Sequence, residues 1–169
     1  MRRAQEKVQR QVGDLLKKNG ITRPPVPVET IAQNLKIDVR FEAAEDDLSG
    51  ALIRKPREVV IGVNSAHHPN RQRFTIAHEI GHFILHKGIK LHVDEDFRVN
   101  LRDGSVNWEE IEANAFAAEL LMPTEFVTRD TKKYDRIDRA AILRLARRYQ
   151  VSQRAMEIKL TNLGLEPPQ

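Results

Sequence analysis

The sequence has no cysteine, few aromatic residues and no long apolar run. The absence of cysteine excludes disulfides, iron–sulfur clusters, cysteine-ligated zinc and a thiol nucleophile. A transition metal bound to this chain would therefore need imidazole and carboxylate ligands. No apolar stretch approaches the roughly 20 residues that span a bilayer. Because the first residues are charged and unlike a signal peptide, we expect a cytoplasmic protein without a membrane partner.

The length of 169 residues suits one domain, or one domain with a small appendage. Charge is unevenly distributed: residues 1–20 carry +4 and residues 129–160 carry +6, whereas residues 21–128 carry −5. The basic ends are either solvated helix faces or surfaces that dock a partner. We predict a main domain over residues 1–128 and a basic helical segment over residues 129–169 that packs on the same domain.

Hydrophobic periodicity predicts an α+β fold, with helices packed on a small three-stranded sheet. Helices are expected at residues 4–18, 28–35, 69–86, 108–121, 137–149 and 152–163, and Thr124 is expected to cap another short helix. Strands are expected at residues 37–41, 49–54 and 58–63, the last two forming a hairpin. Residues 87–107 have a weak pattern and are predicted to form a long loop.

Three of the six histidines lie within nine residues, and two of them belong to an H-E-x-x-H motif. His78 and His82 are four residues apart in a segment with the apolar periodicity of a buried helix, so both imidazoles can bind one zinc ion. Glu79 is turned about 100° away from His78, where its carboxylate can act as general base on a water that the metal activates. Two surface histidines are the alternative, but burial without partners would be costly.

A catalytic zinc site needs a third protein ligand and an open position. His86 follows His82 by four residues, but it lies about 12 Å from His78 along the helix axis. The three histidines therefore cannot bind one ion, and the third ligand must come from another segment. His86 is left as a neighbour that orients a ligand or stabilises the oxyanion.

The helix predicted at residues 108–121 supplies the missing carboxylate. Glu110 and Asn114 are i, i+4 neighbours on one face, and we predict Glu110 as the ligand and Asn114 as a partner that orients a zinc-bound histidine. Glu109 and Glu112 compete with Glu110, since acidic residues in a first turn are commonly surface charges that favour the helix dipole. One zinc ion suits this donor set best, and manganese also fits it.

Two parts of the predicted site have several candidates. The second oxyanion donor is His86, His92 or Tyr134, and a packing role is the alternative for each. Residues 59–63 are either an exposed strand along which an extended substrate pairs, or an edge strand with no role in binding.

Two segments, residues 74–86 and 110–123, together resemble the ImmA/IrrE family of bacterial and phage metallopeptidases. The similarity continues through residues 151–164 and covers roughly residues 20–165 of the chain. It implies a compact gluzincin-like fold with zinc held by two histidines and a glutamate, and it maps that glutamate onto Glu110. It also implies cleavage of a helix-turn-helix repressor of the Xre type, which derepresses genes of a mobile element or a stress response. Some family members act in toxin–antitoxin-like pairs.

The basic C-terminal segment supports a rival hypothesis. Residues 141–156 follow the L-A-x-x-Y-x-V-S-x-x-A-M cadence of a helix-turn-helix, which is typical of DNA binding. Against this, Ile158, Leu160 and Leu163 look like packing residues, and the turn lacks glycine. We therefore assign no residue to nucleic-acid contact and keep DNA binding as the alternative function. A binding module with an inactive site is a third interpretation, which the intact H-E-x-x-H motif disfavours.

Overall fold

The structure is a computed structural model, and it describes residues 2–88, 90–95 and 107–165. Packing divides the chain into two compact units: a first unit of Pro27–Ala117, and a second unit of Met1–Val26 together with Ala118–Gln169. The described residues form seven helices and one mixed four-stranded sheet. This confirms the predicted α+β class. The predicted division into residues 1–128 and 129–169 stays a prediction.

The sheet belongs to the first unit and has the strand order β1-β3-β2-β4. β1 (Ile37–Glu42) pairs in parallel with β3 (Glu58–Asn64), and β2 (Leu48–Lys55) pairs antiparallel with β3 and with β4 (Leu91–Glu95). The β2–β3 hairpin is confirmed. The prediction of three strands was wrong, because β4 lies inside the segment expected to be a loop. Residues 96–106 of that segment lie outside the described residues.

β3 is an internal strand, flanked by β1 and β2. Residues 59–63 were predicted to form either an exposed strand that pairs with the substrate or an edge strand with no role in binding. Both predictions were therefore wrong. The run Val59-Val60-Ile61-Gly62-Val63 is continuously apolar apart from its glycine, which is typical of a strand covered on both faces. Among the described strands, β1 and β4 form the two edges of the sheet.

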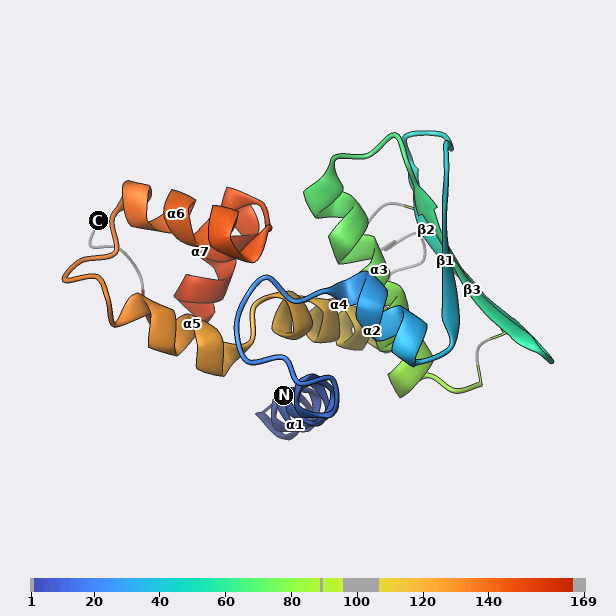
Figure 1. Cartoon of the computed structure of the whole chain (residues 1–169), viewed down its shortest axis with the longest axis horizontal. Helices are drawn as coiled ribbons and strands as arrows, with labels where there is room; N and C mark the ends of the chain where they lie inside the picture. The colour runs from blue at the N-terminus through green and yellow to red at the C-terminus, as the bar shows by residue number, and fades with distance from the viewer. Residues whose placement is uncertain (1, 89, 96–106, 166–169) are drawn as a thin grey trace. The chain divides into compact units, whose positions relative to one another are not determined.

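Helices of the first unit lie on one side of this sheet in Figure 1. α3 (Pro69–Leu85) packs on β2 and β3, and α2 (Val28–Asn34) packs on β1 and α3. A Cβ atom added at Gly50 of β2 would collide with the side chain of Thr75 in α3. β2 and α3 therefore approach closely at Gly50 and Thr75. This contact sets the distance between α3 and the sheet.

The remaining helices are α1 (Arg2–Lys18), α4 (Trp108–Leu121), α5 (Thr124–Thr131), α6 (Arg139–Tyr149) and α7 (Gln153–Asn162). α4 belongs to the first unit up to Ala117, and its last residues belong to the second. The second unit has its own apolar core, whose fully buried large side chains are Leu120, Leu121, Leu145, Tyr149, Met156 and Leu160. None of the described helices is both long and apolar enough to cross a membrane.

Helix boundaries differ from the predictions mainly at the caps. Asp138 accepts a hydrogen bond from the Ala141 amide and caps α6, and Ser152 caps α7 in the same way. Thr124 does not cap α5, contrary to the prediction, because Pro123 occupies the N-cap position. The amide and the hydroxyl of Thr124 instead donate to the carboxylate of Glu119, at 2.9 Å and 2.8 Å.

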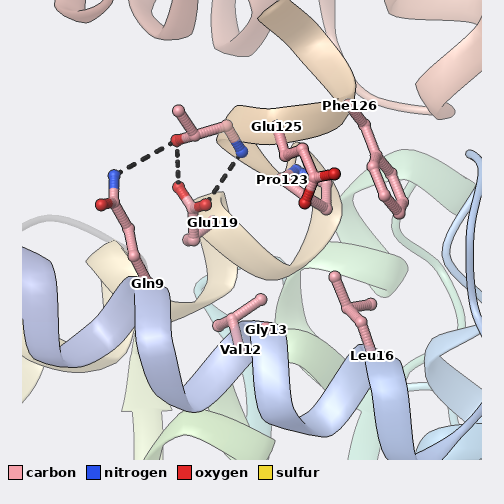
Figure 2. Close-up of a pocket in the computed structure, with 9 residues that line it drawn as sticks. Gln9, Val12, Gly13, Leu16, Glu119, Pro123, Glu125 and Phe126 are labelled. Carbon is pink, nitrogen blue, oxygen red and sulfur yellow. Dashed lines mark hydrogen bonds between the residues drawn. The ribbon is translucent and has the colours of Figure 1, made fainter. Parts of the chain in front are cut away.

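A pocket of about 300 Å³ lies between α1 and the start of α5 in the second unit. Figure 2 shows Val12 and Leu16 of α1 on one side and Phe126 of α5 on the other. Its polar end is closed by Glu119, whose carboxylate accepts hydrogen bonds from Thr124 and, at 2.6 Å, from the Lys159 ammonium. The buried charge of Glu119 on the pocket wall is thus paired with the Lys159 ammonium.

Candidate metal centre

α3 supplies the three residues of the H-E-x-x-H motif. His78, Glu79 and His82 are all fully buried. The Nε2 atoms of His78 and His82 lie 3.0 Å apart. One helical turn therefore stacks the two imidazoles as the sequence spacing predicts.

α4 brings a carboxylate to these two histidines. Glu110 places Oε2 3.3 Å from Nε2 of His78 and Oε1 3.1 Å from Nε2 of His82. The two competing residues do not reach this point: Glu109 is exposed, and the carboxylate of Glu112 contacts His86 instead. The structure thus brings together the three residues predicted as ligands.

A third histidine, which sequence reasoning did not assign to the metal, completes the group. His92 of β4 places Nε2 2.7 Å from Oε1 of Glu110, and its ring stacks on that of His82 with centroids 3.8 Å apart. The ligand atoms of His78, His82, His92 and Glu110 all lie within 4.8 Å of one another. The alternation of Leu91, His92 and Val93 in the sequence could have indicated this role. It is typical of a short strand in which His92 lies on the face opposite to Leu91 and Val93.

The far nitrogens of the two motif histidines are also engaged. Nδ1 of His78 lies 3.0 Å from Oδ1 of Asn114, and Nδ1 of His82 lies 3.0 Å from Nδ1 of His86. Nε2 of His86 in turn lies 3.1 Å from Oε2 of Glu112. Each motif histidine is therefore held through its Nδ1, which leaves Nε2 facing the common centre.

The end of α3 near the site is capped from the sheet. The Arg54 guanidinium of β2 donates to the carbonyl oxygens of His82, Phe83 and His86 through one nitrogen, at 2.9–3.2 Å. Phe83 lies in the last turn of α3 and His86 is its C-cap residue, where carbonyls lack amide partners from a following turn, whereas the His82 carbonyl also accepts the His86 amide. Arg54 thereby ties the helix that carries the histidines to the sheet that carries His92.

The electrostatics of the group follow from the fully buried carboxylate of Glu79 and the partly exposed carboxylate of Glu110 among the imidazoles. Burial would raise the pKa of Glu110, but hydrogen bonds from His78, His82 and His92 outweigh it and hold this pKa far below its usual range. Burial would lower the pKa of His92, but its hydrogen bonds to Glu110 and Glu79, with their charges, raise it to about 10. Burial lowers the pKa of His82. His92 contacts both carboxylates, so in the chain alone they favour its protonated form.

This donor set fits a divalent metal ion. Two ligand atoms of a tetrahedral zinc ion, with bonds of about 2.0–2.1 Å, lie roughly 3.3 Å apart. The Nε2 atoms of His78 and His82 lie 3.0 Å apart, and each lies within 3.3 Å of one of the two Glu110 oxygens. Imidazole and carboxylate ligands suit zinc, and manganese is compatible with them. The fully buried carboxylate of Glu79 and the partly exposed carboxylate of Glu110 also favour a nearby positive charge.

The predicted oxyanion candidates differ in their contacts. His86 contacts His82 and Glu112, outside the group of four ligand atoms. Tyr134 belongs to the second unit, where the Arg144 guanidinium lies 5.4 Å from the centre of its ring. His92, the third candidate, is the one that contacts Glu79, with Nδ1 3.2 Å and 3.3 Å from the two carboxylate oxygens.

Residues 32–161 match the model of the IrrE N-terminal-like domain, Peptidase_M78. The chain is similar to the radiation response metalloprotease IrrE of Deinococcus radiodurans, with 36% identity over 112 residues, or 63% of this chain and 32% of that protein. It is 39% identical over 102 residues to the protein of the same description from Deinococcus deserti, covering 57% of this chain and 34% of that protein. The chain thus matches about a third of the length of these curated relatives.

The fold is also similar to that of a solved structure, a transcriptional regulator of Mycobacterium tuberculosis. The TM-score is 0.60 at 17% identity, and the match covers 95% of this chain and 47% of that one. At this identity the likeness shows the fold alone. The family match, however, spans most of the chain and contains the whole candidate metal centre. The chain belongs to the IrrE N-terminal-like family of metallopeptidases, as its two central motifs predicted.

Proposed function

We propose that this chain is a zinc-dependent endopeptidase domain that hydrolyses a peptide bond in a protein partner. The observation that carries the proposal is the meeting of His78 and His82 from α3 with Glu110 from α4, beside the buried carboxylate of Glu79. Two imidazoles and a carboxylate are a recurrent ligand set of catalytic zinc in peptidases. The family match supports the same class of reaction.

Different residues of the chain have different roles in amide hydrolysis. His78, His82 and Glu110 would hold the ion, and Asn114 and His86 keep the two imidazoles in the orientation that presents Nε2. When bound, zinc supplies Lewis acidity and activates water for attack on the carbonyl. Glu79 accepts the proton of the attacking water and passes it to the leaving amine, the role of a general base and then a general acid.

The substrate is expected to bind as an extended strand along β4. β4 is an edge strand among the described strands, and it carries His92 into the metal centre. An edge strand offers unpaired backbone groups to which an extended peptide can add. This edge replaces β3, which the sequence had suggested for the same purpose and which is internal.

The proposed partner is a helix-turn-helix repressor of the Xre type. This assignment rests on the resemblance of the two central motifs, and the curated relatives are described as radiation response metalloproteases. Cleavage of such a repressor would derepress genes of a mobile element, a toxin–antitoxin-like pair or a stress response. Because repressors act on DNA in the cytoplasm, we place the reaction there.

The experiment is incubation of the zinc-loaded chain with an Xre-type repressor encoded beside its own gene. Intact-mass analysis is expected to show two fragments whose masses sum to that of the repressor plus one water. A chelator should stop the cleavage, and added zinc should restore it. Cleavage that is unaffected by chelation, or no cleavage of the neighbouring repressor by metal-loaded protein, would contradict the proposal.

A second candidate function is DNA binding by α6 and α7, and one observation favours it. Gln150 ends α6 in the left-handed conformation, with φ of 53°. The turn therefore has the backbone geometry that a glycine would supply, although the sequence has none there. The lack of glycine, which had counted against a helix-turn-helix, no longer does so. Arg144, Arg147 and Arg154 are exposed on these helices.

A gel shift with the intact chain separates this candidate from the peptidase. DNA binding through phosphate contacts predicts an affinity that falls steeply with salt concentration. Charge reversal at Arg147 and Arg154 should then weaken binding without changing repressor cleavage. If no complex forms at low salt, this second function is excluded.

A further inference from the structure

We infer that His92 is a fourth protein ligand of the metal, so that the resting site is closed and opens only when β4 is displaced. The inference rests on the proposed metal site and deepens it. A catalytic zinc site usually has three protein ligands and one open position, whereas a site with four protein ligands is closed. The geometry points to a resting state of the closed kind, with His92 in the position that a substrate would need.

The first support is that His92 presents itself to the centre in the same way as the two motif histidines. All three direct Nε2 at the carboxylate of Glu110: the distances are 3.3 Å for His78, 3.1 Å for His82 and 2.7 Å for His92. The four ligand atoms form one group within 4.8 Å. His86, only four residues from His82, is not part of that group. The histidines of the proposed metal site are therefore defined by the shared orientation of their Nε2 atoms, and not by proximity in sequence.

The second support is the partner of the far ring nitrogen. A neutral imidazole that binds metal through Nε2 carries its hydrogen on Nδ1, and it needs an acceptor there. Asn114 is placed to accept from His78, His86 from His82, and the Glu79 carboxylate from His92. His92 thus has both features of a ligand histidine, an Nε2 aimed at the centre and an acceptor for Nδ1.

The third support is the element that carries His92. His78, His82 and Glu110 belong to two helices, whereas His92 belongs to β4, which pairs with β2 on one side only among the described strands. Its neighbours Leu91 and Val93 are exposed, at 61% and 46%. β4 is therefore the element that an added substrate strand would contact, and movement of this one strand removes one ligand while three remain. The same contact between His92 and Glu79 occupies the general base until β4 moves.

The test counts imidazole ligands directly. One sample of the full chain is loaded with one equivalent of zinc and measured by X-ray absorption. A second sample is loaded with cobalt and measured by visible spectroscopy. We expect three imidazoles in the unmodified protein and two in His92→Gln, with a zinc dissociation constant raised at least about 10-fold, the lower end of what loss of a supporting contact costs. Two imidazoles in both proteins would overturn the inference.

A second measurement reports the open position without using activity. Acetohydroxamate, a small metal-binding probe, is titrated into the cobalt-loaded proteins. We expect it to bind His92→Gln at least about 10-fold more tightly than the unmodified chain, because a vacant position is present from the start. Equal affinity for the two would contradict a closed resting site. Circular dichroism establishes that the variant is folded, and His92→Asn repeats the measurement if it is not.

Two controls separate this inference from the proposed function. His68→Gln removes an exposed histidine near the start of α3 and should change neither the imidazole count nor the hydroxamate affinity. His82→Gln should abolish stoichiometric metal binding. If His82→Gln binds zinc like the unmodified chain, the metal site itself is wrong. If His82→Gln loses zinc while His92→Gln keeps the same spectrum as the unmodified chain, only the fourth ligand is wrong.

Discussion

Gly81 of α3 lies directly against the backbone of Ala113 in α4. A Cβ atom added at Gly81 would be 3.3 Å from the Cα and carbonyl oxygen of Ala113, and 3.2 Å from the ring of Phe116. This contact sets the distance between the helix that carries His78 and His82 and the helix that carries Glu110. The glycine in H-E-x-G-H is thus a spacing residue for the metal centre, because the neighbouring backbone has little room to yield.

Gly81→Val is expected to push the two helices apart. Overpacking of a core typically costs about 1–3 kcal/mol, and a side chain there also widens the gap between Glu110 and the two histidines. We expect a lower midpoint in urea unfolding together with weaker zinc binding in a competition titration. Gly13→Val is the matched control, since a Cβ at Gly13 meets nothing within 4 Å. Unchanged zinc affinity in folded Gly81→Val would contradict the spacing role.

Glu110→Gln tests which acidic residue of α4 holds the metal. The substitution keeps the size of the side chain and removes its charge at the point that faces His78 and His82. We expect zinc affinity to fall by more than the roughly 10–100-fold that loss of an outer contact causes. Glu109→Gln, one residue away and exposed, should bind zinc like the unmodified chain. The opposite ranking of the two variants would move the ligand to Glu109.

The chain of contacts from Glu112 through His86 to His82 predicts an effect on metal affinity without loss of a ligand. Glu112→Gln removes the charge that faces Nε2 of His86, at 3.1 Å. We expect the zinc dissociation constant to rise about 10-fold, the lower end for such partners, because the Glu112 side chain is 40% exposed. His86→Gln should have an effect at least as large. Isothermal titration measures both, and if neither variant differs from the unmodified chain, His86 has a packing role only.

Much of this site follows from the periodicity of two helices. The four-residue spacing of His78 and His82, and of Glu110 and Asn114, is local information that helix geometry converts into shared faces. His92 could not be assigned in the same way, because its place depends on β4 pairing with β2 about forty residues earlier in the chain. The internal position of β3 likewise depends on parallel pairing with β1, which no local pattern encodes. The predicted cap at Thr124 was wrong because Pro123 occupies the N-cap position, and the Thr124 hydroxyl donates to the charged Glu119 carboxylate instead.

The second unit makes a separate prediction about acid stability. Burial would raise the pKa of Asp130, but hydrogen bonds from Arg148, Lys133 and Tyr149 outweigh it and hold this pKa below its usual value. A carboxyl group whose pKa is lower in the folded state stabilises the fold above its unfolded pKa of about 3.9, and that contribution disappears as the pH falls through the folded pKa. The unit should therefore lose stability below about pH 4.

Asp130→Asn is expected to lower the free energy of unfolding at pH 7 by about 1.5–3 kcal/mol, the range for hydrogen bonds to a charged group. The gap between this variant and the unmodified chain should shrink as the pH drops below about 4, because both then lack the charge. Urea unfolding at several pH values measures it. Asp135→Asn, at an exposed position, should follow the unmodified chain throughout. A gap that stays constant down to pH 2 would show that the charge of Asp130 does not contribute.

The most direct test of the account is cleavage of the repressor by Glu79→Gln. This substitution keeps the shape of a fully buried side chain and leaves His78, His82 and Glu110 in place. The account predicts that the variant still binds one zinc ion and that its cleavage rate falls at least about 100-fold, the lower range for loss of a general base. A zinc-loaded variant that cleaved the repressor at the unmodified rate would contradict the central claim.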